Sequence, residues 1–440
     1  MTGRNRVLQR FAGDQMEDMT LQLRSFAGLF VFAGLAWTLG PRQRFPVLLL
    51  LGSIGMQLLI AWLLYSVTPF RAFLQSLTGV VMVLQEVTNE GAQFVFGYLS
   101  GAPSPFVLDP DGGSLFLFAF QALPMVIVLS ALSALLWRWR ILELLVRGFA
   151  YAFRRLLNLS GAASLGAAAN IFLGMTESPV LIRPRLPQMS KSDLFLIMTV
   201  GFATVAGSVM ALYVSQLTGV IANAAGHIFT ASLISVPAAV LLARLMMPAE
   251  PDSVEAEAEK IPAPIYNSSM DALTTGVSDG MRLYFNIIFM LLVFTALVAL
   301  TNVLLALLPD VHDAPLSAER ILGWLFAPIV WLAGIPWSEA TAAGSLMGLK
   351  TALNEIYAYD QLARLGDALS PRSNLIMTYA LCGFANFASV GILTGGLVAI
   401  APSRREDILN LAPKALISGT LATLMTGAAI GVFPMSLFGS

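Results

Sequence analysis

Residues 376–392 read IMTYALCGFANFASVGI, a run that is apolar enough to lie in lipid. Its middle nevertheless holds Asn386 and Ser389, and glycine occupies positions 383 and 391. In a regular spanning helix these polar groups would face hydrocarbon, where an unsatisfied group is costly. The stretch therefore predicts a spanning helix with an interruption, whose polar groups face protein or a watery cavity.

The composition of the whole chain indicates a membrane protein. The 440 residues are 57% hydrophobic and 12% charged, about half the charged share that soluble proteins carry. We expect an all-α polytopic fold, because only helices and closed barrels satisfy their backbone within lipid. Apolar runs of about 17–25 residues predict about eight transmembrane helices. They cover about 22–40, 45–66, 114–136, 194–217, 230–247, 283–305, 374–398 and 412–436.

Several function classes are disfavoured by what the chain contains. The net charge of −1 argues against a nucleic-acid partner. The single cysteine, Cys382, excludes an internal disulfide, and His227 and His312 lie far apart in expected loops, which argues against a metal centre. No catalytic motif appears, so we do not expect an enzyme. Residues 1–24 lack the apolar core of a signal peptide, so the first span would serve as the insertion signal.

The segments between the spans are of three kinds. Residues 69–99 and 138–158 have the pattern of amphipathic helices, and the second is basic and suited to the membrane interface. Residues 160–190 and 335–360 are rich in small residues and contain a glutamate, which predicts two re-entrant helical hairpins. Residues 248–282 are expected to form a cytoplasmic loop.

Basic residues predict the orientation. Arg42, Arg44, the 138–158 helix and the segments 183–193 and 402–407 should share the cytoplasmic side. Strict alternation then places the N-terminal arginines outside, against the same rule, so the side of the N-terminus stays open.

A repeat links the two hairpins. Residues 197–209, IMTVGFATVAGSV, match the opening stretch, and each copy follows one hairpin and precedes another span. Paired interrupted segments in two halves are typical of secondary transporters built from inverted repeats. A packing seam of small residues is the alternative for either copy alone. The expected domains are an N-terminal scaffold (1–158), a first repeat (159–247), the loop, a scaffold span (283–305) and a second repeat (320–436).

Two glutamates in the hairpins need a reason. An acid at the centre of a bilayer costs about 2.5–3.5 kcal/mol on insertion scales, so it usually marks a pathway or a pair. Glu177 could instead pair with Arg183 or Lys191, and Glu355 with Lys350. We expect both glutamates to face one cavity.

The second interrupted helix adds polar and aromatic groups to that cavity. If helix persists through the interruption, Asn386 and Ser389 share a face. Phe384 could pack against a base or sugar ring, with ordinary core packing as the alternative.

These residues resemble the concentrative nucleoside transporters. The likeness rests on GMTESPVLIRPRLPQMSKSDLFLIMTVGFATVAGSVMALYV (174–214), KTALNEIYAY (350–359) and LSPRSNLIMTYALCGFANFASVGILTGGLVAIAPSRR (369–405), and extends from about residue 28 to residue 432. It implies a homotrimer in the bacterial inner (plasma) membrane. It also implies nucleoside uptake coupled to Na⁺ or H⁺, with no other cofactor, by a transport domain that moves against a scaffold in an elevator-like cycle.

The resemblance also implies roles for particular residues. The ribose would be bound by Glu355, Asn386 and Ser389. The base would be read by the hairpin-tip residues Thr176 and Glu177, with Phe384 and Val209 packing around the ligand. A sodium ion would be bound by Asn170, the Leu173 carbonyl, the Thr204 hydroxyl and the Val205 carbonyl.

One position departs from the family pattern. Met175 stands where the family usually has a glutamine whose amide reads the base. A thioether has no donor and is a weak acceptor, so base preference stays open. The alternatives are a transporter of another polar solute, such as a modified nucleoside or nucleobase, a nucleoside-binding sensor without transport, and a passive channel.

Overall fold

The computed structural model describes residues 2–42, 44–107, 115–217, 219–249, 266–311 and 314–438, and for 2–15, 17 and 367 it describes the backbone alone. Within these ranges the regular structure is helical, apart from one isolated bridge between Val311 and Ala314. The all-α prediction is therefore confirmed for the described chain. His312 lies outside the described residues.

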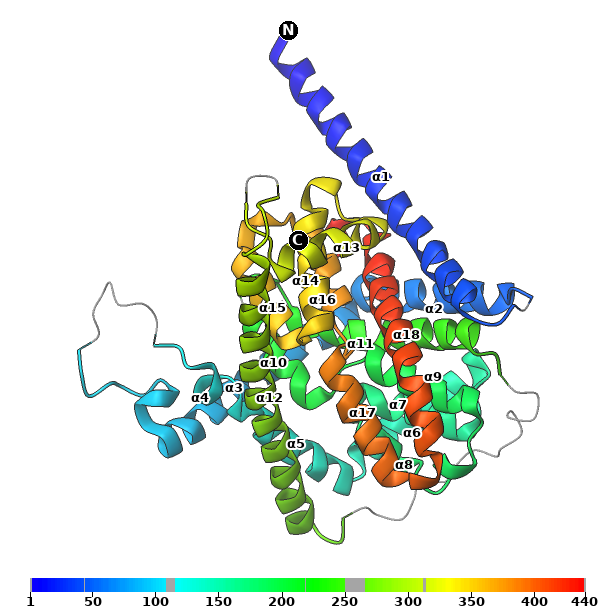
Figure 1. The fold of residues 1–440 in the computed structure, drawn as a ribbon, viewed down its shortest axis with the longest axis vertical. Helices are drawn as coiled ribbons and strands as arrows, with labels where there is room; N and C mark the ends of the chain where they lie inside the picture. Colours follow the sequence, from blue (N-terminus) through cyan, green and yellow to red (C-terminus); the bar gives the residue numbers. More distant parts are fainter. Residues whose placement is uncertain are drawn as a thin grey trace.

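Helices follow one another along the whole chain (Figure 1). The first part contains α1 (Thr2–Leu39), α2 (Val47–Ser66), α3 (Thr68–Phe96), α4 (Phe118–Gln121), α5 (Pro124–Arg138), α6 (Ile141–Leu157), α7 (Gly161–Leu173), α8 (Ser178–Leu181), α9 (Lys191–Ala203) and α10 (Gly207–Leu217). The second part contains α11 (Ala224–Met246), α12 (Ser269–Leu305), α13 (Ala318–Leu332), α14 (Trp337–Ala352), α15 (Glu355–Leu365), α16 (Pro371–Leu381), α17 (Phe387–Ile400) and α18 (Arg405–Gly431).

Seven stretches of the described chain are helical, long and apolar enough to cross a bilayer. They are Asp18–Leu39, Val47–Ser66, Phe118–Arg138, Lys191–Leu217, Ala224–Met246, Ser269–Leu305 and Pro402–Gly431. The pair α13 and α14, which is bent by 117°, would bring the number to eight. The expected span at 374–398 is instead two short helices, α16 and α17, on either side of the predicted interruption.

Helix–turn–helix pairs lie at both positions where hairpins were expected, and both interruptions are present. The first hairpin consists of α7, a turn and the short α8, and the second consists of α14 and α15, which extends past residue 360 to Leu365. The first interruption separates α9 from α10, and the second separates α16 from α17. We call residues 204–206 the first break and residues 382–386 the second break.

Two expectations about boundaries and loops were wrong. His227 lies in the first turn of α11 and not in a loop, because its Nδ1 is held by the hydroxyl groups of Tyr65 (2.8 Å) and Tyr379 (3.0 Å). Helix α12 begins at Ser269, so residues 269–282 are helix and not loop. The segment was predicted as loop because its residues are polar, but its glycines pack closely on α5. A Cβ at Gly276 or Gly280 would lie 2.7 Å from a Cα of α5.

Helix α13 has no counterpart among the elements expected from the sequence. It packs closely on α14, since a Cβ at Gly323 would lie 2.9 Å from the carbonyl oxygen of Thr341. Small residues therefore set the approach of this pair, as is common between helices in membranes.

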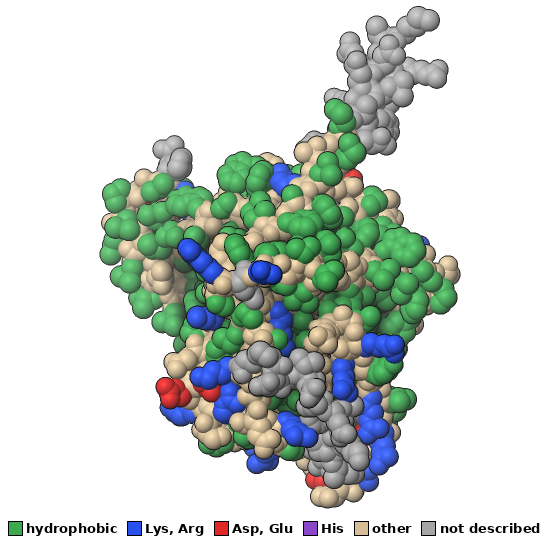
Figure 2. Space-filling model, turned by 90° about the vertical axis from the view of Figure 1, so that its right-hand side faces the viewer, with side chains coloured by type: hydrophobic (Ala, Val, Ile, Leu, Met, Phe, Trp, Pro, Cys, Tyr) green, Lys and Arg blue, Asp and Glu red, His purple; other side chains and the backbone are tan. Residues whose placement is uncertain are grey.

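Burial separates an inner group of helices from an outer one. Helices α9 and α11 are almost wholly buried. Helix α12, which runs along the length of the molecule in Figure 1, leaves most of its apolar surface exposed. Figure 2 shows one face on which hydrophobic side chains cover the upper part and Lys and Arg gather in the lower part. Such a division is expected of a chain that is immersed in lipid with one end among charged head groups.

Two of the basic segments meet, as the orientation prediction required. Lys191 Nζ lies 2.8 Å from Asp407 Oδ1, and Arg404 donates to the carbonyl oxygen of Met189 at 2.6 Å. The segments 183–193 and 402–407 therefore lie at the same end of the molecule.

Candidate functional site

One cavity lies where the hairpin tips and the two breaks meet. It encloses about 100 Å³, and about 730 Å³ when all empty space out to the open mouth is included. Every residue that the sequence analysis assigned to substrate lines it: Met175, Thr176, Glu177, Val209, Glu355, Phe384, Asn386 and Ser389. Glu177 and Glu355, from opposite hairpins, therefore face one shared space.

Glu355 is fixed by two buried donors. It lies in the first turn of α15, directly after Asn354, whose side chain caps the helix by accepting from the Tyr357 backbone N–H. Its Oε1 accepts from the Tyr213 hydroxyl at 2.8 Å, and its Oε2 accepts from Asn386 Nδ2 at 2.8 Å. Each oxygen keeps a further lone pair, so the carboxylate can also accept from a bound hydroxyl.

Asn386 connects the second break to this carboxylate. It is the N-cap of α17, and its Oδ1 accepts from the Ser389 backbone N–H at 2.7 Å. Helix does not persist through the break, so the expected helical face of Asn386 and Ser389 is replaced by a capping bond. Asn386 thereby directs its amide nitrogen toward Glu355.

Glu177 begins the short helix α8 at the tip of the first hairpin. Among the described residues it forms no ion pair with Arg183 or Lys191, and Lys191 is paired with Asp407. Glu177 lines both the cavity and a wider vestibule between α5, α8 and α12, where Asp279 and Arg282 lie. The surface-pairing alternative for Glu177 is thus not found.

Lys350 likewise does not form the surface pair that was considered for Glu355. Its ammonium is buried and donates to the Ala380 carbonyl oxygen and to Thr423 Oγ1, both at 2.9 Å.

The four residues expected at an ion site surround the first break. Leu173 ends α7, Thr204 caps the end of α9, and Val205 follows in the break. The Thr204 hydroxyl donates to the Val200 carbonyl at 2.9 Å, which leaves its oxygen lone pairs free to bind a cation.

Asn170 is a second indication of an ion site at the first break. It is buried, and neither its Oδ1 nor its Nδ2 has a hydrogen-bond partner. Buried polar atoms without partners are rare, and each calls for an explanation such as an ion or a water. A set of amide, hydroxyl and carbonyl oxygens fits Na⁺, which prefers hard oxygen ligands from unwound backbone.

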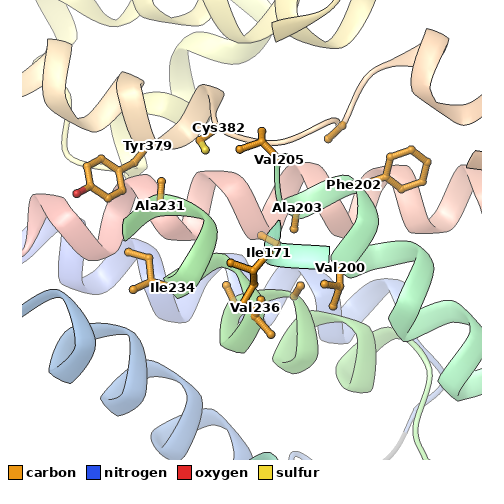
Figure 3. Packing of buried hydrophobic residues seen from close by; sticks show 14 of the residues in the cluster. Ile171, Val200, Phe202, Ala203, Val205, Ala231, Ile234, Val236, Tyr379 and Cys382 are labelled. Carbon is orange, nitrogen blue, oxygen red and sulfur yellow. The ribbon is translucent and has the colours of Figure 1, made fainter. Parts of the chain in front are cut away.

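The two breaks pack directly on each other, and glycine makes this possible. Gly383 has φ 152°, and a Cβ there would lie 2.8 Å from the Phe202 carbonyl oxygen. Phe384 N donates to the Thr204 carbonyl at 3.4 Å, and Figure 3 shows Val205 close to Cys382. A larger residue at 383 would separate the proposed ion site from the cavity.

Sequence reasoning missed Tyr213, the hydroxyl that holds Glu355. Tyr213 is fully buried in α10, and its ring stacks at a tilt on Tyr359, with centroids 4.8 Å apart. The available signal was a phenol one helical turn after Val209 in an otherwise apolar segment, since a buried hydroxyl usually has a partner.

Comparisons with known proteins agree with this arrangement. Residues 27–99 and 227–431 match the families described as "Na+ dependent nucleoside transporter N-terminus" and "C-terminus", and residues 119–219 match "Nucleoside recognition". The chain is 34% identical to "Nucleoside permease NupC" of Helicobacter pylori over 418 residues, which cover 93% of this chain and 97% of that protein. It is 34% identical to human "Solute carrier family 28 member 3", of whose length it spans 60%.

Solved structures of CNTnw have the same fold. The inward-facing substrate-bound state matches with a TM-score of 0.84 at 33% identity and covers 96% of this chain and 99% of that chain. An outward-facing state matches with a TM-score of 0.83. The sequence matches, the shared fold and the cavity between paired hairpins lead to one conclusion. The chain belongs to the Na⁺-dependent nucleoside transporter family.

Proposed function

We propose that this protein is a symporter that imports nucleosides across the bacterial inner membrane, driven by a Na⁺ gradient. The observation that carries the proposal is the cavity in which Glu355 is held by Tyr213 and Asn386. A carboxylate with spare lone pairs suits the hydroxyl donors of a ribose, and the apolar side chains of Val209 and Phe384 suit a flat base.

In this proposal each half of the site has its own task. Glu355, Asn386 and Ser389 bind the sugar, and Thr176 and Glu177 at the first hairpin tip face the base. Met175 lines the same end of the cavity without offering a donor, so discrimination between bases should be weak.

Ion and substrate are coupled through the first hairpin. Helix α7 ends at Leu173, and the next residue, Gly174, has a φ of 88° and begins the hairpin tip. A Cβ at Gly174 would lie 2.7 Å from Ala206 Cβ, so the tip rests on the first break. Sodium bound by Asn170, Leu173, Thr204 and Val205 would thus order the segment that carries Thr176 and Glu177.

The movement that follows is proposed to be elevator-like. The repeats 159–247 and 320–436, in inverted orientation, would form the transport domain, and residues 1–158 with α12 would form the scaffold of a homotrimer. The mostly exposed apolar surface of α12 supports a position against lipid or a neighbouring subunit. In this proposal the vestibule, which shares Thr176 and Glu177 with the cavity, would be the route between the cavity and water.

Uptake of labelled uridine and adenosine into proteoliposomes, with Na⁺ replaced by choline at two pH values, tests the proposal. We expect accumulation that requires Na⁺ and changes little with pH. Accumulation that follows pH and ignores Na⁺ would assign the coupling to H⁺.

Met175 favours a second candidate, a transporter of another polar solute such as a modified nucleoside or a nucleobase. Competition by unlabelled uridine, adenosine and free ribose separates the two. Binding of uridine without accumulation would instead indicate a sensor, and equilibration without accumulation would indicate a channel.

A further inference from the structure

The two breaks differ in how their exposed helix ends are satisfied. A helix that stops leaves its last carbonyl oxygens without intrahelical partners. At the second break, the end of α16 is met by Lys350, a fully buried side chain of α14. Its Nζ donates to the Ala380 carbonyl oxygen at 2.9 Å and to Thr423 Oγ1 at 2.9 Å.

The hydrogen-bond directions identify Lys350 as the donor in both contacts. The Ala380 carbonyl can only accept, and the Thr423 hydroxyl hydrogen is already given to the Thr420 carbonyl at 3.0 Å. An ammonium, which has three donors and no acceptor, suits such a place. The negative end of the α16 dipole also favours a cation there. Among the described residues no carboxylate forms an ion pair with Lys350, and the nearby buried Glu355 interacts with it electrostatically without a direct contact.

The first break has a neutral side chain, Asn170, beside the end of α9. Counted from the shared Ile-Met-Thr, Ala380 corresponds to Gly201. A Cβ on Gly201 would lie 3.5 Å from Nδ2 of Asn170, which comes from α7 of the first hairpin as Lys350 comes from α14 of the second. Asn170 is buried with both polar atoms unpartnered, whereas Lys350 is buried with oxygen partners.

We propose that the Lys350 ammonium is a tethered cation that occupies, at the second break, the place that the coupling ion occupies at the first. This inference rests on the proposed function as a Na⁺ symporter. The second break then needs no mobile ion, so one coupling ion crosses with each nucleoside. An asparagine at position 350 would remove the tethered charge, copy the first break and create a second ion site.

Stoichiometry tests the proposal directly. Purified protein in proteoliposomes takes up labelled uridine and radioactive Na⁺ in the same experiment, and the wild type is expected to move about one Na⁺ per uridine. Well below half-saturation, doubling the Na⁺ concentration should raise initial uptake about twofold in the wild type and about fourfold in Lys350→Asn. Lys350→Met fills the space without a charge or an oxygen ligand. Its uptake rate should be lower than that of the wild type, but doubling the Na⁺ concentration should still raise this rate about twofold.

Thermal unfolding in detergent gives a second readout that needs no transport. Lys350→Asn should have a lower midpoint than the wild type without Na⁺ and a larger rise as Na⁺ is added. A folded Lys350→Asn protein with the wild-type Na⁺ response in both assays overturns the proposal. A fourfold response in Lys350→Met also overturns it, because the added ion would then bind elsewhere.

If Lys350→Asn does not fold, the wild-type ratio still decides, since about two Na⁺ per uridine contradicts a tethered cation. Failure of the proposed function looks different: the wild type would then accumulate no nucleoside under any Na⁺ gradient. In that case the Na⁺-dependent unfolding midpoints of the wild type and Lys350→Asn still test the tethered cation.

Discussion

Replacing Glu355 by glutamine is expected to reduce nucleoside uptake strongly while the hairpin stays folded. Glutamine has nearly the same shape and keeps one acceptor oxygen for either Tyr213 or Asn386, which now donate to Oε1 and Oε2 at 2.8 Å each. It loses the charge and presents an amide nitrogen where the second oxygen was. The bond to a nucleoside hydroxyl should therefore suffer most.

The size of the effect follows from the strength of charge-assisted hydrogen bonds. A hydrogen bond to a charged group contributes about 1.5–3 kcal/mol, so its loss should lower kcat/KM about 10- to 150-fold. Glu355→Ala would in addition leave the Tyr213 hydroxyl and Asn386 Nδ2 buried without a partner, at about 1–3 kcal/mol each. We therefore expect both variants to have a lower unfolding midpoint, with a smaller decrease in Glu355→Gln, which leaves one buried donor unpaired, than in Glu355→Ala, which leaves two.

Initial rates of labelled uridine uptake under a Na⁺ gradient, over a range of uridine concentrations, measure this effect. Asp360→Asn is the matched control, because Asp360 lies on the same helix and pairs with Arg364 (2.7 Å), with side chains 38% and 71% exposed. Such surface pairs contribute about 0–1 kcal/mol, so this variant should behave like the wild type. Unchanged kcat/KM in Glu355→Gln, or an equal loss in Asp360→Asn, would refute the reasoning.

Three further predictions concern other parts of the molecule. Asn170→Ala should raise the Na⁺ concentration for half-maximal uptake about tenfold, because the loss of one oxygen ligand should weaken Na⁺ binding by about 1.4 kcal/mol. It should also reduce the Na⁺-dependent rise of the unfolding midpoint. An unchanged Na⁺ dependence would show that Asn170 does not belong to the ion site. Met175→Gln adds an amide donor and acceptor at the hairpin tip, so the ratio of uridine to adenosine kcat/KM should shift about tenfold or more, and a constant ratio would show that position 175 does not contact the base. Asp193→Ala removes a buried partner of Arg244 (2.5 Å) and of the Ser160 hydroxyl (2.6 Å), so unfolding in detergent should become easier by about 3–5 kcal/mol; a loss below about 1 kcal/mol would contradict a buried, structural ion pair.

Much of the fold could be predicted because lipid imposes simple length rules on a chain. Apolar runs predicted the spanning helices, and small residues with Asn386 predicted the second break, which the structure confirms. Predicted helix boundaries were wrong where close packing between helices, and not local hydrophobicity, determines the extent of a helix. Residues 269–282 look polar, yet Gly276 and Gly280 let this segment continue α12 against α5.

The residues of the cavity were predictable as a set, but their partners were not. Glu355 was weighed against a pair with Lys350, five positions before it, because neighbours in sequence are the partners that can be seen without a structure. The structure instead bonds Glu355 to Tyr213, at a separation of 142 residues, and directs Lys350 to the end of another helix. His227 was assigned to a loop for the same reason, since Tyr65 lies 162 residues away from it.

The sequence by itself determined that this chain lies in a membrane, that two of its helices are broken, and that two acidic hairpins accompany the breaks. These features follow from local composition, because unpaired backbone groups and charges raise the free energy wherever they lie in the bilayer. The tertiary structure alone decided which polar groups meet: Tyr213 and Asn386 at Glu355, and Lys350 at Ala380. Those choices depend on how closely the helices approach in three dimensions, and distant segments of the chain set that approach together.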